Sequence, residues 1–180
     1  FTSRACTRSL VLNYSPGIPT ASNNGPLCVG ATLNLTTPAV VGATYAWTGP
    51  NSFSSTLQNP TIAGVTLADA GTYNVIVSLN GCTSTAGTTT VAVNPVPVVV
   101  DQTASFITGG TFTVTPASVP VGTTYTWTAP VYTGGVTGGS AQATAQPNIS
   151  GTLTIPAGTG TATYTVTPVS GTCTGATFTV

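Results

Sequence analysis

The sequence predicts an all-β fold of two tandem β-sandwiches with an extended N-terminal strand. Three observations lead to this prediction: Thr and Val are abundant, short runs alternate apolar with polar residues, and one set of landmark residues occurs twice. β-Branched residues suit a pleated strand, and a period of two indicates a strand that is buried on one face. Because 41% of the residues are hydrophobic, folding is favoured over disorder.

Short alternating runs separated by Gly, Asn and Pro indicate the individual strands. In the first sandwich they are Thr32–Leu35, Thr44–Trp47, Thr72–Val77 and Thr88–Val93. In the second sandwich they are Thr111–Thr115, Thr123–Thr128, Thr152–Ile155 and Thr161–Thr167. Strands this short, joined by turns, are typical of a sandwich.

A tandem repeat is visible in two matching segments. Thr44–Pro50 and Thr124–Pro130 share the pattern Thr-Tyr-x-Trp-Thr-x-Pro. Trp47 and Trp127 hold the same place in the two segments, so we expect both of them in the core. Extra length in the second copy falls around Val131–Ala145 and indicates a long loop or an added hairpin.

A Tyr followed nine residues later by a Cys completes each copy. Tyr73 precedes Cys82 in the first copy, and Tyr164 precedes Cys173 in the second. We expect both tyrosines in the core. Proline pairs mark the junctions, so the expected division is an N-terminal segment 1–16, a first domain 17–95 and a second domain 96–180.

The order of Cys28, Trp47 and Cys82 is the one found in immunoglobulin-like sandwiches, where a disulfide joins the two sheets against a core Trp. We therefore predict a Cys28–Cys82 disulfide. The run Asp69-Ala70-Gly71-Thr72-Tyr73 is typical of a tyrosine corner, in which the phenol binds the backbone across a turn. A disulfide implies an oxidising, extracellular location.

Two cysteines, Cys6 and Cys173, have no partner in this scheme. The segment around Cys6 looks like the last strand of a domain, whereas the second domain lacks the end of its own last strand. One interpretation is that both ends are cuts from a longer repeat array. The other is that the N-terminal segment is donated to the second domain of a neighbour, with an inter-subunit Cys6–Cys173 disulfide. The donated strand would comprise Ser9, Leu10, Val11, Leu12, Asn13 and Tyr14.

Only four residues are charged: Arg4, Arg8, Asp69 and Asp101. Lys, Glu and His are absent, so the groups that perform general acid–base catalysis are missing. Metal sites need clustered His, Cys or carboxylates, and nucleic-acid binding needs many Lys and Arg. We therefore expect no enzyme activity, no catalytic, cofactor-binding or metal-ligating residue, no nucleic-acid partner and no membrane insertion.

Several motifs resemble a known class of protein. Pro26–Leu33, Tyr45–Phe53, Gln58–Pro60 and Ala68–Tyr73 resemble immunoglobulin-like repeats of large Bacteroidetes surface proteins. Tyr125–Pro130 and Gly171–Cys173 resemble the PKD-like repeats that accompany them in gliding-motility adhesins. The resemblance covers roughly residues 17–180. It implies a secreted or cell-surface role in adhesion, motility or filament formation, with export by the type IX system.

The function that follows is a structural subunit or repeat segment of an extracellular filament or cell-surface adhesin, assembled end to end. The alternative is a ligand-binding adhesin module that takes a carbohydrate or a protein partner. The expected partners are copies of the chain in a head-to-tail polymer or adjacent repeats, with glycans as a further candidate. A surface with so little charge has little protection against association. We therefore expect neighbouring subunits, neighbouring repeats or glycans to cover it.

Overall fold

The computed structural model describes residues 15–180. They divide into two compact units, which are interleaved along the chain. Unit 1 holds the described residues up to Gly25 together with Thr32–Ala63 and Ala68–Ala92, whereas unit 2 holds Pro26–Ala31, Gly64–Leu67 and Val93–Val180. The domain boundaries expected near residues 16 and 95 stay predictions. Within the described part of the chain, no helix has the length and hydropathy needed to cross a membrane.

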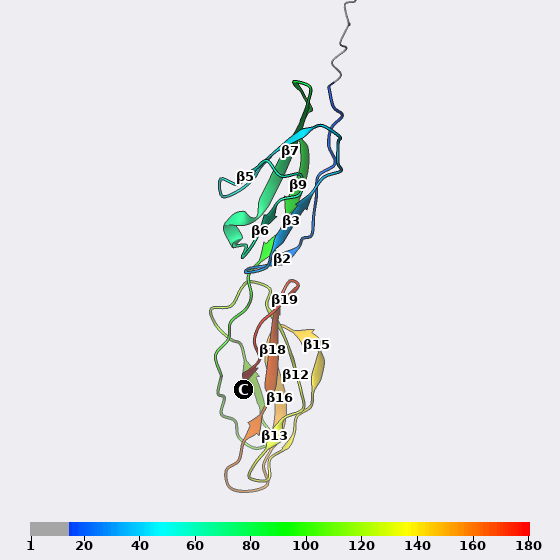
Figure 1. The fold of residues 1–180 in the computed structure, drawn as a ribbon. Coiled ribbons are helices and arrows are strands. Elements are labelled where there is room, and N and C mark those ends of the chain that lie inside the picture. The colour runs from blue at the N-terminus through cyan, green and yellow to red at the C-terminus, as the bar shows by residue number, and fades with distance from the viewer. Residues whose placement is uncertain (1–14) are drawn as a thin grey trace, which may run out of the picture. The chain divides into compact units, whose positions relative to one another are not determined.

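Unit 1 consists of two antiparallel sheets (Figure 1). The first has the order β1-β3-β6, formed by β1 Ser22–Asn23, β3 Leu33–Thr36 and β6 Thr61–Ile62. The second has the order β5-β4-β7-β8, and β9 also pairs with β7. Its strands are β4 Thr44–Thr48, β5 Ser54–Ser55, β7 Gly71–Leu79, β8 Cys82–Thr83 and β9 Gly87–Val91. A single 3₁₀ turn, η1 Leu67–Asp69, precedes β7.

Alternation along these strands places the apolar side chains of unit 1 on the inner faces of its sheets. Leu33 and Leu35 on β3 are fully buried, and the alternating polar residues Asn34 and Thr36 are exposed. Trp47 on β4 lies opposite Val75 on β7, and both side chains are buried. Tyr73 is also buried, and its ring meets the edge of Phe53 at a centroid distance of 5.5 Å.

Unit 2 repeats this plan with additional short strands. One sheet has the order β11-β16-β14, formed by β11 Thr111–Val114, β16 Ile149–Thr154 and β14 Thr137–Gly138. A second has the order β15-β12-β18-β19, with β20 also paired to β18. Its strands are β12 Thr124–Trp127, β15 Gln142–Gln146, β18 Thr165–Ser170, β19 Cys173–Thr174 and β20 Phe178–Thr179. Two small pairs complete the unit: β13 Val131–Tyr132 with β17 Ala162–Thr163, and β2 Leu27–Cys28 with β10 Val93–Asn94.

The core of unit 2 mirrors that of unit 1. Trp127 on β12 lies opposite Val166 on β18, as Trp47 lies opposite Val75 in unit 1. Tyr164 is 1% exposed and packs against Phe112 with ring centroids 5.4 Å apart. The two units therefore share a register that allows their residues to be compared one to one.

The all-β prediction is confirmed, and each of the eight predicted strands overlaps a strand of the structure. The segment Val131–Ala145 differs from expectation, because it is neither a bare loop nor a hairpin. It holds β13, β14 and the start of β15, which pair with three different strands, β17, β16 and β12.

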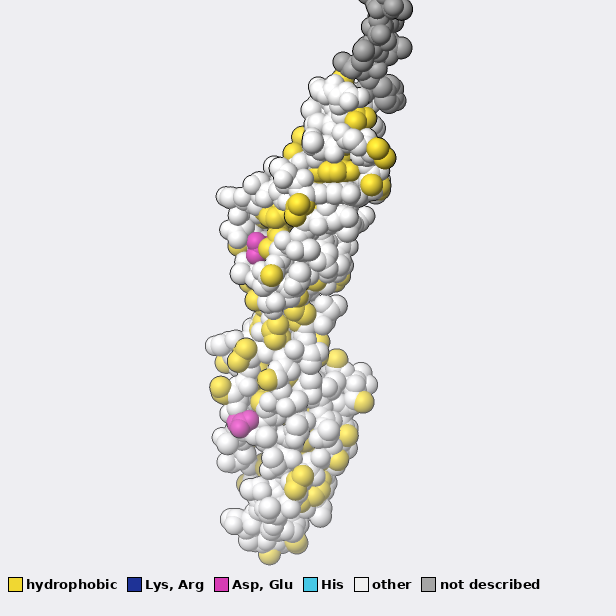
Figure 2. Space-filling model, in the orientation of Figure 1, with side chains coloured by type: hydrophobic (Ala, Val, Ile, Leu, Met, Phe, Trp, Pro, Cys, Tyr) yellow, Lys and Arg dark blue, Asp and Glu magenta, His cyan; other side chains and the backbone are white. Residues whose placement is uncertain are grey.

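Large apolar side chains remain on the surface of both units. Val41, Ile107 and Val121 are at least 83% exposed. Figure 2 shows hydrophobic side chains scattered among uncharged polar atoms on the face in view, with few charged groups between them. Such a surface offers little electrostatic resistance to association.

Candidate functional site: two cysteine hairpins and an apolar groove

Cys173 lies on the short hairpin that follows the long strand β18 of unit 2. Ser170 on β18 pairs with Cys173, and Val169 pairs with Thr174. The side chain of Cys173 is fully buried. It is joined by a disulfide to Cys28, from which it is separated by 145 residues in the sequence.

The segment that carries Cys28 is part of unit 2 and is held there by backbone pairing as well. Strand β2 runs parallel to β10, with Leu27 opposite Val93 and Cys28 opposite Asn94. The Val29 amide donates to the Asn94 carbonyl over 3.0 Å. That same carbonyl lies 3.7 Å from Cys173 Sγ, so Asn94 adjoins both halves of the disulfide.

The predicted Cys28–Cys82 disulfide is therefore wrong, since Cys28 is bonded to Cys173 and Cys82 is free among the described residues. The inter-subunit Cys6–Cys173 link is contradicted for the same reason. In an immunoglobulin domain the second bridging Cys lies two residues after the corner Tyr. Here that position is Val75, a buried core residue, whereas Cys82 comes after the end of β7 on the edge strand β8.

Cys82 occupies in unit 1 the place that Cys173 occupies in unit 2. Leu79 on β7 pairs with Cys82 on β8, and Ser78 pairs with Thr83. The cysteine is partly exposed. The chain entering unit 1 passes this hairpin, where the Ser15 hydroxyl donates to the Thr83 carbonyl over 2.7 Å.

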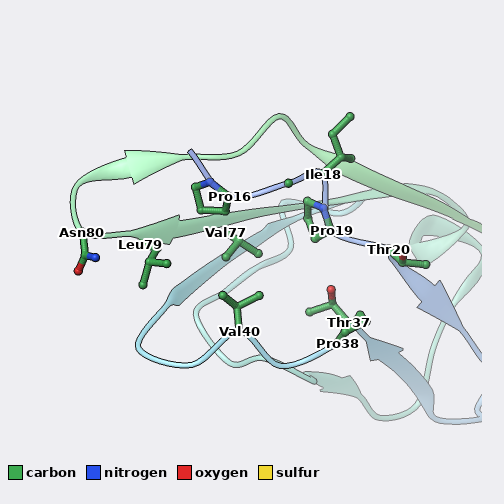
Figure 3. Close-up of a pocket in the computed structure, with 11 residues that line it drawn as sticks. Pro16, Ile18, Pro19, Thr20, Thr37, Pro38, Val40, Val77, Leu79 and Asn80 are labelled. Carbon is green, nitrogen blue, oxygen red and sulfur yellow. The ribbon is translucent and has the colours of Figure 1, made fainter. Parts of the chain in front are cut away.

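An apolar groove opens beside this hairpin, with a cavity volume of about 490 Å³. Its walls come from the entering chain, from the segment that follows β3, and from the end of β7 (Figure 3). Val40 and Val77 face each other across the groove in Figure 3. Pro16, Leu79 and Asn80 line the end that leads to the hairpin turn.

The wall of the groove includes a buried polar atom without a partner. Thr37 is 4% exposed, and no described residue offers a hydrogen bond to its hydroxyl. In Figure 3 the hydroxyl is directed toward the groove. A buried hydroxyl without a hydrogen bond is costly, so this atom favours an occupant that brings a backbone donor or acceptor.

The two core tyrosines differ in their hydrogen bonding. The Tyr73 hydroxyl donates to the Asp69 carbonyl over 2.9 Å, which is the tyrosine corner that the sequence indicates. Burial raises the pKa of Tyr73 above its ordinary value, and the nearby Asp69 charge raises it further. The Tyr164 hydroxyl is buried and has no hydrogen-bond partner among the described residues. Burial again raises the pKa of this tyrosine.

The remaining predicted site residues are placed as follows. Trp47 and Trp127 are buried, and each indole N–H donates to a backbone carbonyl, that of Gln58 or of Ser140. Cys6 and the segment Ser9–Tyr14 lie outside the described residues. The sequence did offer a reason to consider the observed pairing. Cys82 and Cys173 hold the same repeat position, so spacing alone does not decide which of them bonds to Cys28.

Comparison with known proteins bears on the fold. No family model matches the chain, and no curated protein matches it. Among solved structures, a chain from the complex of a mouse coronavirus receptor-binding domain with its murine receptor is 14% identical. The match covers 90% of this chain and 97% of that chain with a TM-score of 0.54.

Two further solved structures give the same result. Murine CEACAM1b is 14% identical over 89% of this chain and 96% of that chain, with a TM-score of 0.50. The N-terminal eight Ig domains of Down Syndrome Cell Adhesion Molecule are 18% identical over 91% of this chain and 27% of that chain, with a TM-score of 0.56. The chain has the immunoglobulin-like fold. The prediction of tandem immunoglobulin-like β-sandwiches is thereby confirmed.

Proposed function

We propose that this chain is a structural segment of an extracellular filament or cell-surface adhesin built from repeated immunoglobulin-like units. The observation that carries the proposal is the way in which unit 2 is assembled. It takes up Pro26–Ala31, which precedes the core strands of unit 1 in the chain, by parallel pairing and a disulfide. A chain whose successive repeats are interleaved and covalently closed suits a load-bearing role.

An extracellular location is supported by the disulfide, because such bonds persist in oxidising compartments. The immunoglobulin-like fold agrees with a surface role, since one of the similar structures is a cell adhesion molecule and another includes a viral receptor. The resemblance of the first-repeat and second-repeat motifs to Bacteroidetes Ig-like and PKD-like repeats favours a bacterial surface protein.

End-to-end assembly with copies of the chain or with adjacent repeats is the partner relationship we propose. The exposed valines and the scarcity of charge support association of this kind. Donation of Ser9–Tyr14 to a neighbour remains a prediction. It no longer includes a bond to Cys173, because that cysteine is joined to Cys28.

A ligand-binding adhesin module is the second candidate, and the groove of unit 1 is the observation that favours it. Its volume of about 490 Å³ lies within the range of small-molecule pockets, roughly 300–1,000 Å³. Binding of a carbohydrate or a peptide there, without any assembly of the chain, would favour this candidate.

Electron microscopy of material from the native cell surface, labelled with an antibody against this chain, tests the proposal. We expect label along filaments or long surface fibres. Label confined to isolated, non-fibrous molecules would contradict the filament role and leave the binding module as the better explanation.

A further inference from the structure

We propose that the Cys82 hairpin and the adjoining groove of unit 1 form a docking site for a cysteine-bearing strand of a neighbouring immunoglobulin-like unit. The strand would be of the type Pro-Leu-Cys-Val-Gly, as in residues 26–30 of this chain. Its Cys would form a disulfide with Cys82. The inference rests on the proposed function and names the contact through which one repeat would join the next.

The first argument is that the same hairpin is already occupied in unit 2. Leu79 pairs with Cys82 in unit 1 as Ser170 pairs with Cys173 in unit 2. The residue two positions after each cysteine also agrees, because the Ser84 amide donates to the Val77 carbonyl as the Gly175 amide donates to that of Pro168. Cys82 is therefore set in the backbone geometry in which the cysteine of unit 2 holds Cys28.

The second argument is that the hairpin of unit 1 is open where that of unit 2 is covered. Cys173 is fully buried, whereas Cys82 is partly exposed. A methyl group added at Gly171, the first turn residue of unit 2, would lie 3.1 Å from the Asn94 side chain. The corresponding residue of unit 1, Asn80, carries a full side chain that lines the groove.

The groove gives the third argument. It lies next to the open hairpin, with Leu79 and Asn80 in its wall, and its apolar lining suits residues such as the Leu and Val beside Cys28. The Thr37 hydroxyl is buried and has no partner in residues 15–180, so it would gain a hydrogen bond from the backbone of the incoming strand. The occupant is thus an extended peptide with apolar side chains around a Cys.

The chain's own Cys6 does not fit this role. In unit 2 the cysteine strand pairs in parallel with the residues just before Pro95, with Cys28 opposite Asn94. Ser15 holds the corresponding place before Pro16 in unit 1, and Cys6 lies only nine residues before it. Parallel strands need a connection of about a dozen residues or more, so the docking strand must come from elsewhere.

Formation of the bond is an oxidation. The two thiols lose two protons and two electrons to an oxidant of the disulfide class, which is reduced to a dithiol. In the test the oxidant is built into the peptide. The Cys82 thiolate attacks a mixed disulfide between the peptide Cys and 2-nitro-5-thiobenzoate, the new disulfide forms, and coloured nitrothiobenzoate leaves.

The experiment uses the full chain with Cys6→Ser, so that Cys82 is its one free thiol, and the activated peptide of residues 24–31. Release of nitrothiobenzoate gives the rate of disulfide exchange between Cys82 and the peptide, and mass spectrometry identifies the modified cysteine. We expect Cys82 to react about tenfold faster with this peptide than with a scrambled peptide of equal composition, because docking raises the local concentration. Equal rates for the two peptides would overturn the proposal.

Val40→Asp and Val41→Asp provide a matched pair of variants. Val40 lines the groove, whereas Val41 is 96% exposed and does not. We expect Val40→Asp to abolish the preference for the native peptide and Val41→Asp to retain it, with both variants checked for folding by circular dichroism. If both variants retained the preference for the native peptide, the groove would be excluded from the docking site.

Failure here can be distinguished from failure of the proposed function. Labelled filaments without peptide selectivity would overturn this docking site and leave the filament role standing. Peptide selectivity together with isolated, non-fibrous label would support the docking site and contradict the filament role.

Discussion

Unit 1 and unit 2 have the same core plan but differ at two corresponding points. Among the described residues, the hairpin cysteine is free in unit 1 and bonded in unit 2, and the core tyrosine is hydrogen-bonded in unit 1 and without a partner in unit 2. The Trp positions do not differ, because both indoles are buried and donate to a backbone carbonyl. The repeated core is thus kept, while the bonding of the hairpin cysteine and of the core tyrosine differs between the units.

Substitution of the two hairpin cysteines should give the largest difference in the free energy of unfolding between the units. Cys173→Ser removes a bond across 145 residues, and loop-closure entropy predicts a loss of about 5 kcal/mol in the free energy of unfolding. Cys82→Ser removes only a free thiol, so we expect its effect to stay within about 0.5 kcal/mol. Urea unfolding without reductant, followed by the fluorescence of the two Trp residues, measures both variants.

The same bond should limit how far the chain extends under force. Pulling on the two ends of the intact chain transmits force through the Cys28–Cys173 disulfide and spares the residues between them. Reduction or Cys173→Ser should release a contour length on the order of 500 Å, as expected for 145 extended residues. Equal extension with and without reductant in single-molecule pulling would contradict the pairing.

The two core tyrosines should give a smaller difference in the free energy of unfolding, and here unit 1 is the unit that loses stability. Tyr73→Phe removes the hydrogen bond to the Asp69 carbonyl and should destabilise unit 1 by about 1 kcal/mol. Tyr164→Phe removes a buried hydroxyl that has no partner in the described part of the chain, so unit 2 should be unchanged or slightly more stable. Equal losses in the two variants, measured by urea unfolding, would contradict this difference between the two tyrosines.

Much of the fold could be predicted because its signals are local. The alternation of Thr with apolar residues locates β3, β4 and β7, and the Thr-Tyr-x-Trp pattern reveals the repeat. Two-residue strands such as β8 and β19 carry no periodicity, and the position of β2 depends on pairing with β10. These elements follow from tertiary contacts, so no short window of sequence indicates them.

The disulfide shows where sequence reasoning was misled. The order Cys, Trp, Cys suggested an inter-sheet bridge, yet the tyrosine corner already identified Val75 as the position of the second bridging residue. The groove was not predicted, because its walls come from three separate segments, represented by Pro16, Val40 and Val77. Only the fold brings them together beside Cys82.

Asp101 should give the smallest effect. It accepts a hydrogen bond from the Thr179 amide over 2.6 Å, and this interaction lowers the pKa of its carboxyl below the ordinary value of 3.8. A lowered folded-state pKa means that the stabilisation is present above pH 3.8 and is lost as the pH falls through the folded-state value. Asp101→Asn should therefore flatten the decline in the stability of unit 2 as the pH falls below 3.8. Asp101 belongs to unit 2, so the acid response of unit 1 should not change. An unaltered acid profile of unit 2 would mean that the exposed carboxylate contributes nothing to holding β20.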